Sequence, residues 1–145
     1  MHSSSSRWLE YPVQVYPHHT DYAGIVWHGS YIGWMEELRV KALADTGVAF
    51  EQLVQSGCDL PVVDLQIRYR QAMRMGSAGV LKARLLPLKG VRLVWEYELW
   101  NTDEQTLHLT AQVTIVAVNR KTGKIMRQLP ELLQGAIAQL YLSPN

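Results

Sequence analysis

The eight residues V63-D-L-Q-I-R-Y-R70 decide the fold class. Here the repeat of apolar residues changes from about 3.6 residues, typical of a helix, to 2 residues, typical of a strand. Apolar side chains stand at every second position from Val63 to Tyr69 and alternate with polar ones. This alternation is typical of a strand in a sheet with one buried face. The sequence therefore predicts that a sheet begins at this point of the chain.

The segments on either side supply the other elements. Upstream, apolar residues recur at helical spacing from Tyr31 to Thr46, with Ser30 as the predicted N-cap and Gly47 as the stop. A short helical turn is expected at Phe50–Gln55. Further strands are predicted at Trp8–Tyr16, Val80–Leu86, Val91–Trp100 and Leu107–Asn119, and a last helix at Pro130–Tyr141. In Val91–Trp100 and Leu107–Asn119, apolar residues again stand at every second position, which predicts one buried face for each strand.

The long strands need a cover for their apolar face. Short connections between the later strands, L-P-L-K-G and N-T-D-E-Q, predict antiparallel hairpins. The helix at Tyr31–Thr46 is the only sizeable element available to cover them, so we expect an α+β fold in which a curved antiparallel sheet wraps around one long central helix. Apolar residues on the nominally outer faces indicate packing against a second copy; they are Val94, Trp100, Val116 and Val118.

Composition narrows the class of protein. The 145 residues are 48% hydrophobic and 19% charged, which suits one globular domain at residues 8–145 behind a flexible leader at residues 1–7. No apolar run approaches the roughly 20 residues of a membrane span. The single Cys58 cannot form an internal disulfide, so a reducing compartment, the cytoplasm, is expected.

Charge is segregated along the chain although the net charge is only +1. Seven basic residues and no acidic residue lie between Leu65 and Trp95: Arg68, Arg70, Arg74, Lys82, Arg84, Lys89 and Arg92. One interpretation assigns them no function: these side chains are simply solvated on the outer faces of strands. The functional interpretation is an anionic partner, either nucleic acid or the phosphates of a small ligand.

The candidate chemistry lies in the loop T20-D-Y-A-G-I-V-W-H-G-S30, which leads into the long helix. Aspartate and glycine are both common in turns, so Asp21 and Gly24 could serve only to form the loop. The free N–H groups at the helix start, around His28 and Gly29, would nevertheless form a donor site for a developing oxyanion. A carboxylate beside such a site is sufficient for acyl transfer or hydrolysis without a metal. His18 and His19 lie close to Asp21, but H-H-T-D has no standard metal-ligand spacing, so no metal is expected.

The stretch D-Y-A-G-I-V-W-H-G-S-Y-I, followed by G-W-M-E-E-L-R, resembles the signature of hotdog-fold thioesterases of the 4-hydroxybenzoyl-CoA thioesterase type. It is most similar to their YbgC-type acyl-CoA thioesterase branch. The resemblance extends to the strand L-P-V-V-D-L-Q-I-R-Y and to the closing Q-L-P-E-L. The chain departs from the family pattern at Pro17, where a tyrosine is common, and in Y69-R-Q-A-M73, where the family usually has Y-x-x-P-A.

The resemblance implies a hotdog fold and an acyl-CoA thioesterase that releases a free acid and coenzyme A. It matches Asp21 to the catalytic aspartate, as nucleophile or general base, and His28 to the helix-start residue. By this resemblance His28 is also expected to be catalytic: it would orient the carbonyl, hold the water or protonate the leaving thiolate. In the family the site lies at a dimer interface, so a homodimer or homotetramer is implied. Coenzyme A belongs to the substrate and no separate cofactor is expected; its phosphates give the basic segment a partner, with Lys89, Gly90 and Arg92 as candidates at a turn.

Other functions remain open on the sequence. The same fold could hydrate or dehydrate an acyl thioester, although the aspartate matches the thioesterase position. The chain could also be a non-catalytic binding module for acyl-CoA or acyl carrier protein. Nucleic-acid binding through residues 65–95 is the third alternative, and salt-dependent binding to oligonucleotides would reveal it.

Overall fold

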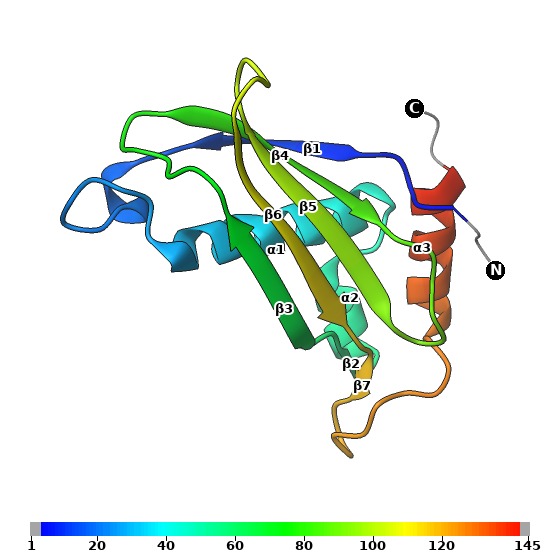
Figure 1. The fold of residues 1–145 in the computed structure, drawn as a ribbon. Helices are drawn as coiled ribbons and strands as arrows, with labels where there is room; N and C mark the ends of the chain where they lie inside the picture. Colours follow the sequence, from blue (N-terminus) through cyan, green and yellow to red (C-terminus); the bar gives the residue numbers. More distant parts are fainter. Residues whose placement is uncertain (1–3, 143–145) are drawn as a thin grey trace.

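The computed structural model describes residues 4–142, which form a curved antiparallel sheet with one long helix across its concave face (Figure 1). The strands are β1 (Leu9–Gln14), β2 (Cys58–Asp59), β3 (Val62–Tyr69), β4 (Ala78–Leu85), β5 (Leu93–Asn101), β6 (Leu107–Ile115) and β7 (Val118–Asn119). The helices are the short 3-10 helix η1 (Pro17–His19), α1 (His28–Asp45), α2 (Phe50–Gln55) and α3 (Glu131–Leu142).

The main sheet has the strand order β1-β4-β5-β6-β3, and every neighbouring pair is antiparallel. The predicted hairpins β4–β5 and β5–β6 are therefore confirmed, as is the α+β class. β3 and β4 are consecutive in the chain but are separated in the sheet by β5 and β6. The connection between them must consequently cross one end of the sheet, where it meets the start of α1.

The core lies between α1 and the sheet. Alternate residues of β5, from Leu93 to Leu99, are buried, and they face the buried side of α1, which carries Trp34, Met35 and Leu38. At the far end, α3 adds Leu133, Ala136, Ile137 and Leu140. The alternation in the sequence therefore predicted the inner face of the central strands correctly.

Helix α1 begins three residues earlier than the apolar spacing predicts. Its N-cap is Trp27, and no side chain caps it. The predicted cap, Ser30, lies inside the first turn and donates its hydroxyl to the carbonyl of His19 at 2.9 Å. The helix ends at Asp45, and Gly47 adopts a left-handed conformation with φ of 94°, as its stop role requires.

Strand β3 does not have the buried face that its alternation predicts. Val63 is 49% exposed, Leu65 39% and Tyr69 52%. β3 is the last strand of the sheet, paired only with β6, so its other edge has no neighbour among the described residues. The apolar side chains of β3 therefore lie at an open edge of this chain.

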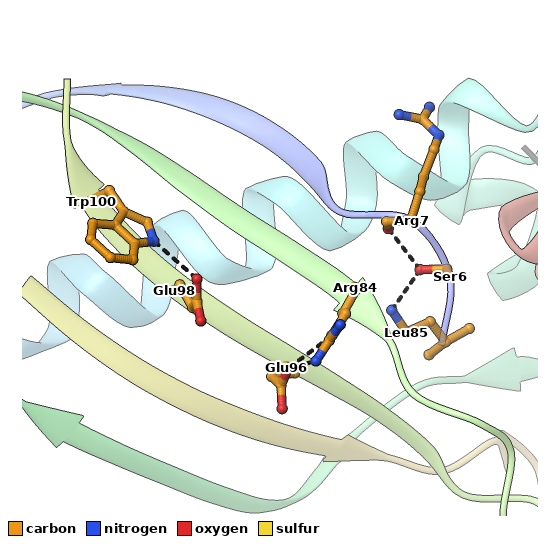
Figure 2. A network of polar contacts seen from close by, with 7 residues as sticks. All are labelled: Ser6, Arg7, Arg84, Leu85, Glu96, Glu98 and Trp100. Carbon is orange, nitrogen blue, oxygen red and sulfur yellow. Dashed lines mark hydrogen bonds and ion pairs between the residues drawn. The ribbon is translucent and has the colours of Figure 1, made fainter. Parts of the chain in front are cut away.

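The outer face of the sheet is largely polar rather than apolar. Figure 2 shows Arg84 paired with Glu96, and the indole of Trp100 donating to Glu98. Val94, Trp100 and Val118 are only partly exposed. Val116 was predicted to face outward but is 2% exposed, because it lies beyond the end of β6, where the strand alternation no longer applies.

The residues before β1 join the sheet earlier than the predicted leader allows. Ser6 is buried, and its backbone N–H donates to the carbonyl of Leu85. Its hydroxyl oxygen accepts the N–H of Leu85 (Figure 2). Residues 1–3 of the predicted leader lie outside the described residues. The sheet therefore has an attachment at Ser6 that the serine-rich composition did not predict.

Two further features concern the whole chain. Cys58 is fully buried at the start of β2, and burial raises the pKa of its thiol, with a smaller contribution from Asp59. None of the helices within residues 4–142 has the length and apolar character needed to cross a membrane.

Candidate active site

A cavity of about 370 Å³ opens where the start of α1 meets the end of β3. Asp21 and His28, both selected from the sequence, line it together. The other lining residues are Ile25, Val26, Trp27, Tyr31, Tyr69, Arg70, Gln71 and Ala72. Tyr31 and Gln71 had no predicted role. For Gln71 the available signal was the altered motif from Tyr69 to Met73, in which it lies, whereas no signal marked Tyr31.

The carboxylate of Asp21 is held by its own loop. Its Oδ1 accepts the N–H of Ala23 at 2.8 Å and that of Ile25 at 3.2 Å. The loop is closed by a bridge between Thr20 and Val26, and Gly24 turns it with a φ of 76°. The turn-forming and functional interpretations of Asp21 are therefore compatible, because Oδ1 forms the turn and Oδ2 makes no hydrogen bond within residues 4–142.

The start of α1, which lines the cavity through His28, has backbone donors without acceptors among residues 4–142. The N–H groups of His28 and Gly29 donate to no acceptor in the described chain, because they lie in the first turn and Trp27 caps without its side chain. The ring of Trp27 lies over Gly29, where a Cβ would be only 2.0 Å from ring atom Cζ3. Only glycine fits under the ring in this position. An anion or a polarised carbonyl oxygen would be stabilised at these two amides.

His19 anchors the other side of the loop. Its carbonyl accepts the N–H of Trp27 and the hydroxyl of Ser30, and its ring Nδ1 accepts the N–H of Tyr16, each at 2.9 Å. The ring packs 4.9 Å from that of Trp34. Burial lowers the pKa of His19, and neighbouring His18 lowers it further, whereas Glu37 opposes the shift. The neutral ring is therefore part of the loop structure.

The connection from β3 to β4 ties this loop to the sheet. We call residues 70–77 the strap. Met73 donates its N–H to the hydroxyl of Tyr31 at 3.3 Å and accepts the N–H of Val26 at 2.9 Å. Met75 donates to the carbonyl of Gly24 at 2.9 Å. The position of the Asp21 loop thus depends on the position of the strap.

The predicted phosphate residues Lys89, Gly90 and Arg92 do not reach this cavity in one chain. They lie in the turn between β4 and β5, whereas the strap enters β4 at its opposite end. The length of β4 separates the two places by on the order of 25 Å.

Some basic residues of this segment pair with carboxylates in the structure, and others do not. Lys82 pairs with Glu104, and Arg84 pairs with Glu96 while stacking on the ring of Trp8. Arg70 and Arg74 lie on the strap and have no carboxylate partner among residues 4–142; Arg70 lines the cavity. The unpaired positive charge nearest Asp21 is therefore on the strap. Within the described residues, no three His, Cys, Asp or Glu side chains are grouped so as to hold a metal ion.

Comparison with known proteins gives consistent results. A family model described as the thioesterase-like superfamily matches residues 15–136. A Synechocystis sp. protein named "Putative esterase sll0410" is 43% identical over 136 residues, covering 94% of this chain and 82% of that protein. The acyl-CoA thioester hydrolase YbgC of Escherichia coli O157:H7 is 27% identical over 139 residues, covering 96% of this chain and 100% of that protein.

The fold has solved counterparts. The crystal structure of a 1,4-dihydroxy-2-naphthoyl-CoA thioesterase from Synechocystis superposes with a TM-score of 0.83, covering 92% of this chain and 98% of that one. The sequence identity is 23%, so this likeness concerns the fold alone. The hotdog architecture expected from the sequence is confirmed.

Proposed function

The chain belongs to the thioesterase-like superfamily, and from this we propose that it hydrolyses an acyl-CoA thioester in the Asp21 cavity. The observation that carries the proposal is that Asp21, whose carboxylate keeps one free oxygen within the described residues, lines one cavity with His28. At His28 and the following Gly29, helix α1 begins with amides that are unpaired in the described chain. The relatives named as thioester hydrolases support the reaction class.

The thioester carbonyl would accept hydrogen bonds from the His28 and Gly29 amides. These donors stabilise the negative charge that develops on the carbonyl oxygen during attack, and loss of one such donor typically costs about 10²–10³ in rate. Because the amides are fixed by the helix, they need no rearrangement when the charge forms. The imidazole of His28 would hydrogen-bond a water or the carbonyl, since His28 lines the same cavity.

Asp21 would act through Oδ2 by one of two routes. As a nucleophile, it forms a mixed anhydride with the acyl group and expels coenzyme A as a thiolate; water then cleaves the anhydride, and one of its protons goes to the thiolate. As a general base, it takes a proton from a water that attacks the carbonyl, and that proton passes to the leaving thiolate. Either route consumes one water and yields a carboxylic acid and a thiol. Neither route requires a cofactor.

The substrate's phosphates would meet the strap. Arg70 lines the cavity, and Arg74 lies opposite Ile25, which also lines it. Neither arginine has a carboxylate partner among residues 4–142, and guanidinium groups bind phosphate in two-point contacts. We therefore place the coenzyme A phosphates at these two residues, ahead of Lys89, Gly90 and Arg92. The latter three would contribute only from a second copy of the chain.

A homodimer built on β3 completes the proposal. The open edge of β3 exposes backbone groups together with Val62, Val63 and Leu65, which is the surface that another strand can pair with. Tyr69 and Arg70, at the end of this edge, line the cavity. A partner strand there would cover one side of the site.

The test is release of coenzyme A from short-chain, long-chain and aromatic acyl-CoAs. We expect Asp21→Asn to lower kcat by at least about 100-fold, because an amide is neither a base nor a nucleophile here. Asp103→Asn is the matched control, since Asp103 also accepts a backbone N–H within an exposed turn, but in the β5–β6 connection. Full activity in Asp21→Asn would refute the assignment, and binding of acyl-CoA without turnover would favour the binding-module alternative.

A further inference from the structure

His108 is a buried histidine outside the cavity for which the reaction above has no use. It is 7% exposed and stands at the start of β6. Apart from Ser6, it is the only buried polar or charged residue within residues 4–142. Its ring Nε2 is buried and has no hydrogen-bond partner. A buried polar atom without a partner is unfavourable, so its presence needs a reason.

The backbone at His108 is irregular. Leu99 pairs with Leu109, but the next residue along β5, Trp100, pairs with Leu107, so His108 is an extra residue opposite β5. Such a bulge redirects a side chain that a regular strand would point elsewhere. The imidazole of His108 is thereby brought to the residues that leave β3.

His108 bonds the first two residues of the strap with both its backbone carbonyl and its side chain. Its carbonyl accepts the N–H groups of Arg70 at 2.9 Å and Gln71 at 3.1 Å. Its ring Nδ1 lies 2.8 Å from the carbonyl oxygen of Gln71. A carbonyl only accepts, so Nδ1 must carry the proton and donate it. In the neutral ring the buried Nε2 then holds an unused lone pair.

Further hydrogen bonds connect the strap, which His108 holds, to the Asp21 loop. The strap is bonded to Tyr31 of α1 and to Val26 through Met73, and to Gly24 through Met75. Ile25, between those two loop residues, donates its N–H to Oδ1 of Asp21. The strap residues Arg70, Gln71 and Ala72 also form one wall of the cavity.

We propose that His108 is a positioning residue, which fixes the strap through Gln71 and so sets the Asp21 carboxylate against the helix-start amides. This inference rests on the proposed function, because it assigns His108 a part in that reaction without contact with the substrate. An apolar side chain at this position would leave the Gln71 carbonyl without this donor and the strap without this attachment. The bond from Nδ1 to Gln71 explains why a histidine stands here although its other ring nitrogen has no partner in the described chain.

The test compares two substitutions of similar size. His108→Leu removes the donor, whereas His108→Asn places an amide N–H near the position of Nδ1 and can restore the bond to Gln71. Ser6→Ala is the control, because Ser6 is the other buried polar residue and bonds Leu85 at the opposite end of β4. For each variant, kcat and KM are measured with the best acyl-CoA of the panel, together with Tm.

We expect His108→Leu to lower kcat by about tenfold or more, since small misplacements of reacting groups cost one to two orders of magnitude. KM should change less than kcat, His108→Asn should recover most of the loss, and Ser6→Ala should lower Tm but leave kcat unchanged. Wild-type kcat in folded His108→Leu would overturn the proposal. Equal damage in His108→Asn and His108→Leu, or in Ser6→Ala, would also overturn it.

Amide hydrogen exchange separates this inference from the proposed function. We expect His108→Leu to speed exchange at Met73 and Val26, and His108→Asn to keep it slow. If the wild-type chain hydrolyses no acyl-CoA, the proposed function fails, and with it the catalytic part of this inference. The coupling of His108 to the loop is then judged by exchange alone, and unchanged exchange in His108→Leu refutes it.

Discussion

A single residue, His19, makes the stability of the protein depend on pH. Its Nδ1 accepts the N–H of Tyr16, and burial lowers the pKa of the ring. The unfolded chain therefore binds a proton at a higher pH than the folded chain does. Stability is unaffected by this group above its ordinary pKa of 6.5, and it falls as the pH drops below that value toward the lowered pKa.

We predict that Tm of the wild type falls between about pH 7 and pH 5, and that His19→Asn reduces this slope. The asparagine oxygen can accept the Tyr16 N–H but does not titrate. Thermal unfolding of both proteins across this range checks the prediction. Equal slopes would show that His19 is not the responsible group.

The two strap arginines give a prediction about substrate affinity. Arg70→Ala and Arg74→Ala should each raise KM for acyl-CoA by about tenfold, because a charge-assisted phosphate contact is lost. KM for the corresponding acyl-pantetheine, which lacks the adenosine phosphates, should change little. Lys89→Ala serves as the comparison. If Lys89→Ala raised KM more than the two strap variants do, the phosphate site would lie at the β4–β5 turn instead.

At the scale of the element, the start of α1 depends on a glycine. A Cβ at position 29 would overlap the ring of Trp27, which is half exposed and free to swing outward. Gly29→Ala should therefore displace the ring from the cavity wall. Alanine also favours the helical backbone, by up to about 1 kcal/mol relative to glycine.

We predict that Gly29→Ala lowers kcat/KM by about tenfold without lowering Tm, and alters tryptophan fluorescence. Gly135→Ala is the control, since Gly135 lies on α3 with no atom within 4 Å of the added Cβ. It should raise or preserve Tm and leave kinetics unchanged. An unchanged kcat/KM in Gly29→Ala would mean that the ring position has no role in the reaction.

The elements also show which information the sequence carries. Alternation predicted the inner faces of β5 and β6, because both strands are covered by α1. It was wrong for β3, because whether a strand lies in the middle or at the edge is a property of the whole sheet. The start of α1 was missed because Trp27 caps without a side-chain bond, so no residue type marks it.

For the candidate site, the sequence could predict the residues that are close together in the chain but not those that the fold brings together. Asp21 and His28 share a short stretch of chain, so the sequence could place them together. The strap residues and His108 come from distant segments and meet only when β3 and β6 pair. Lys89 and Arg92 lie at the other end of β4 from the cavity, a separation within one chain that their charge did not reveal. The roles of all these residues remain predictions.

At the scale of the whole molecule, the open edge of β3 predicts how the chain assembles. The double variant Val63→Lys and Leu65→Lys places charge on that edge and should disfavour strand pairing. We expect light scattering to show half the wild-type mass, and activity to fall because the cavity lies beside this edge. If Val94→Lys on the outer face lowers the mass and the β3 variant does not, the outer face forms the interface.

The burial of Cys58 has a consequence for a chain that is proposed to release a thiol at every turnover. Its only sulfhydryl is inaccessible and protonated at neutral pH, so it neither exchanges with coenzyme A disulfides nor forms mixed disulfides with the product. A chromogenic thiol reagent should detect no sulfhydryl in the native protein and one per chain in denaturant. Every thiol that such a reagent counts during turnover then comes from the substrate.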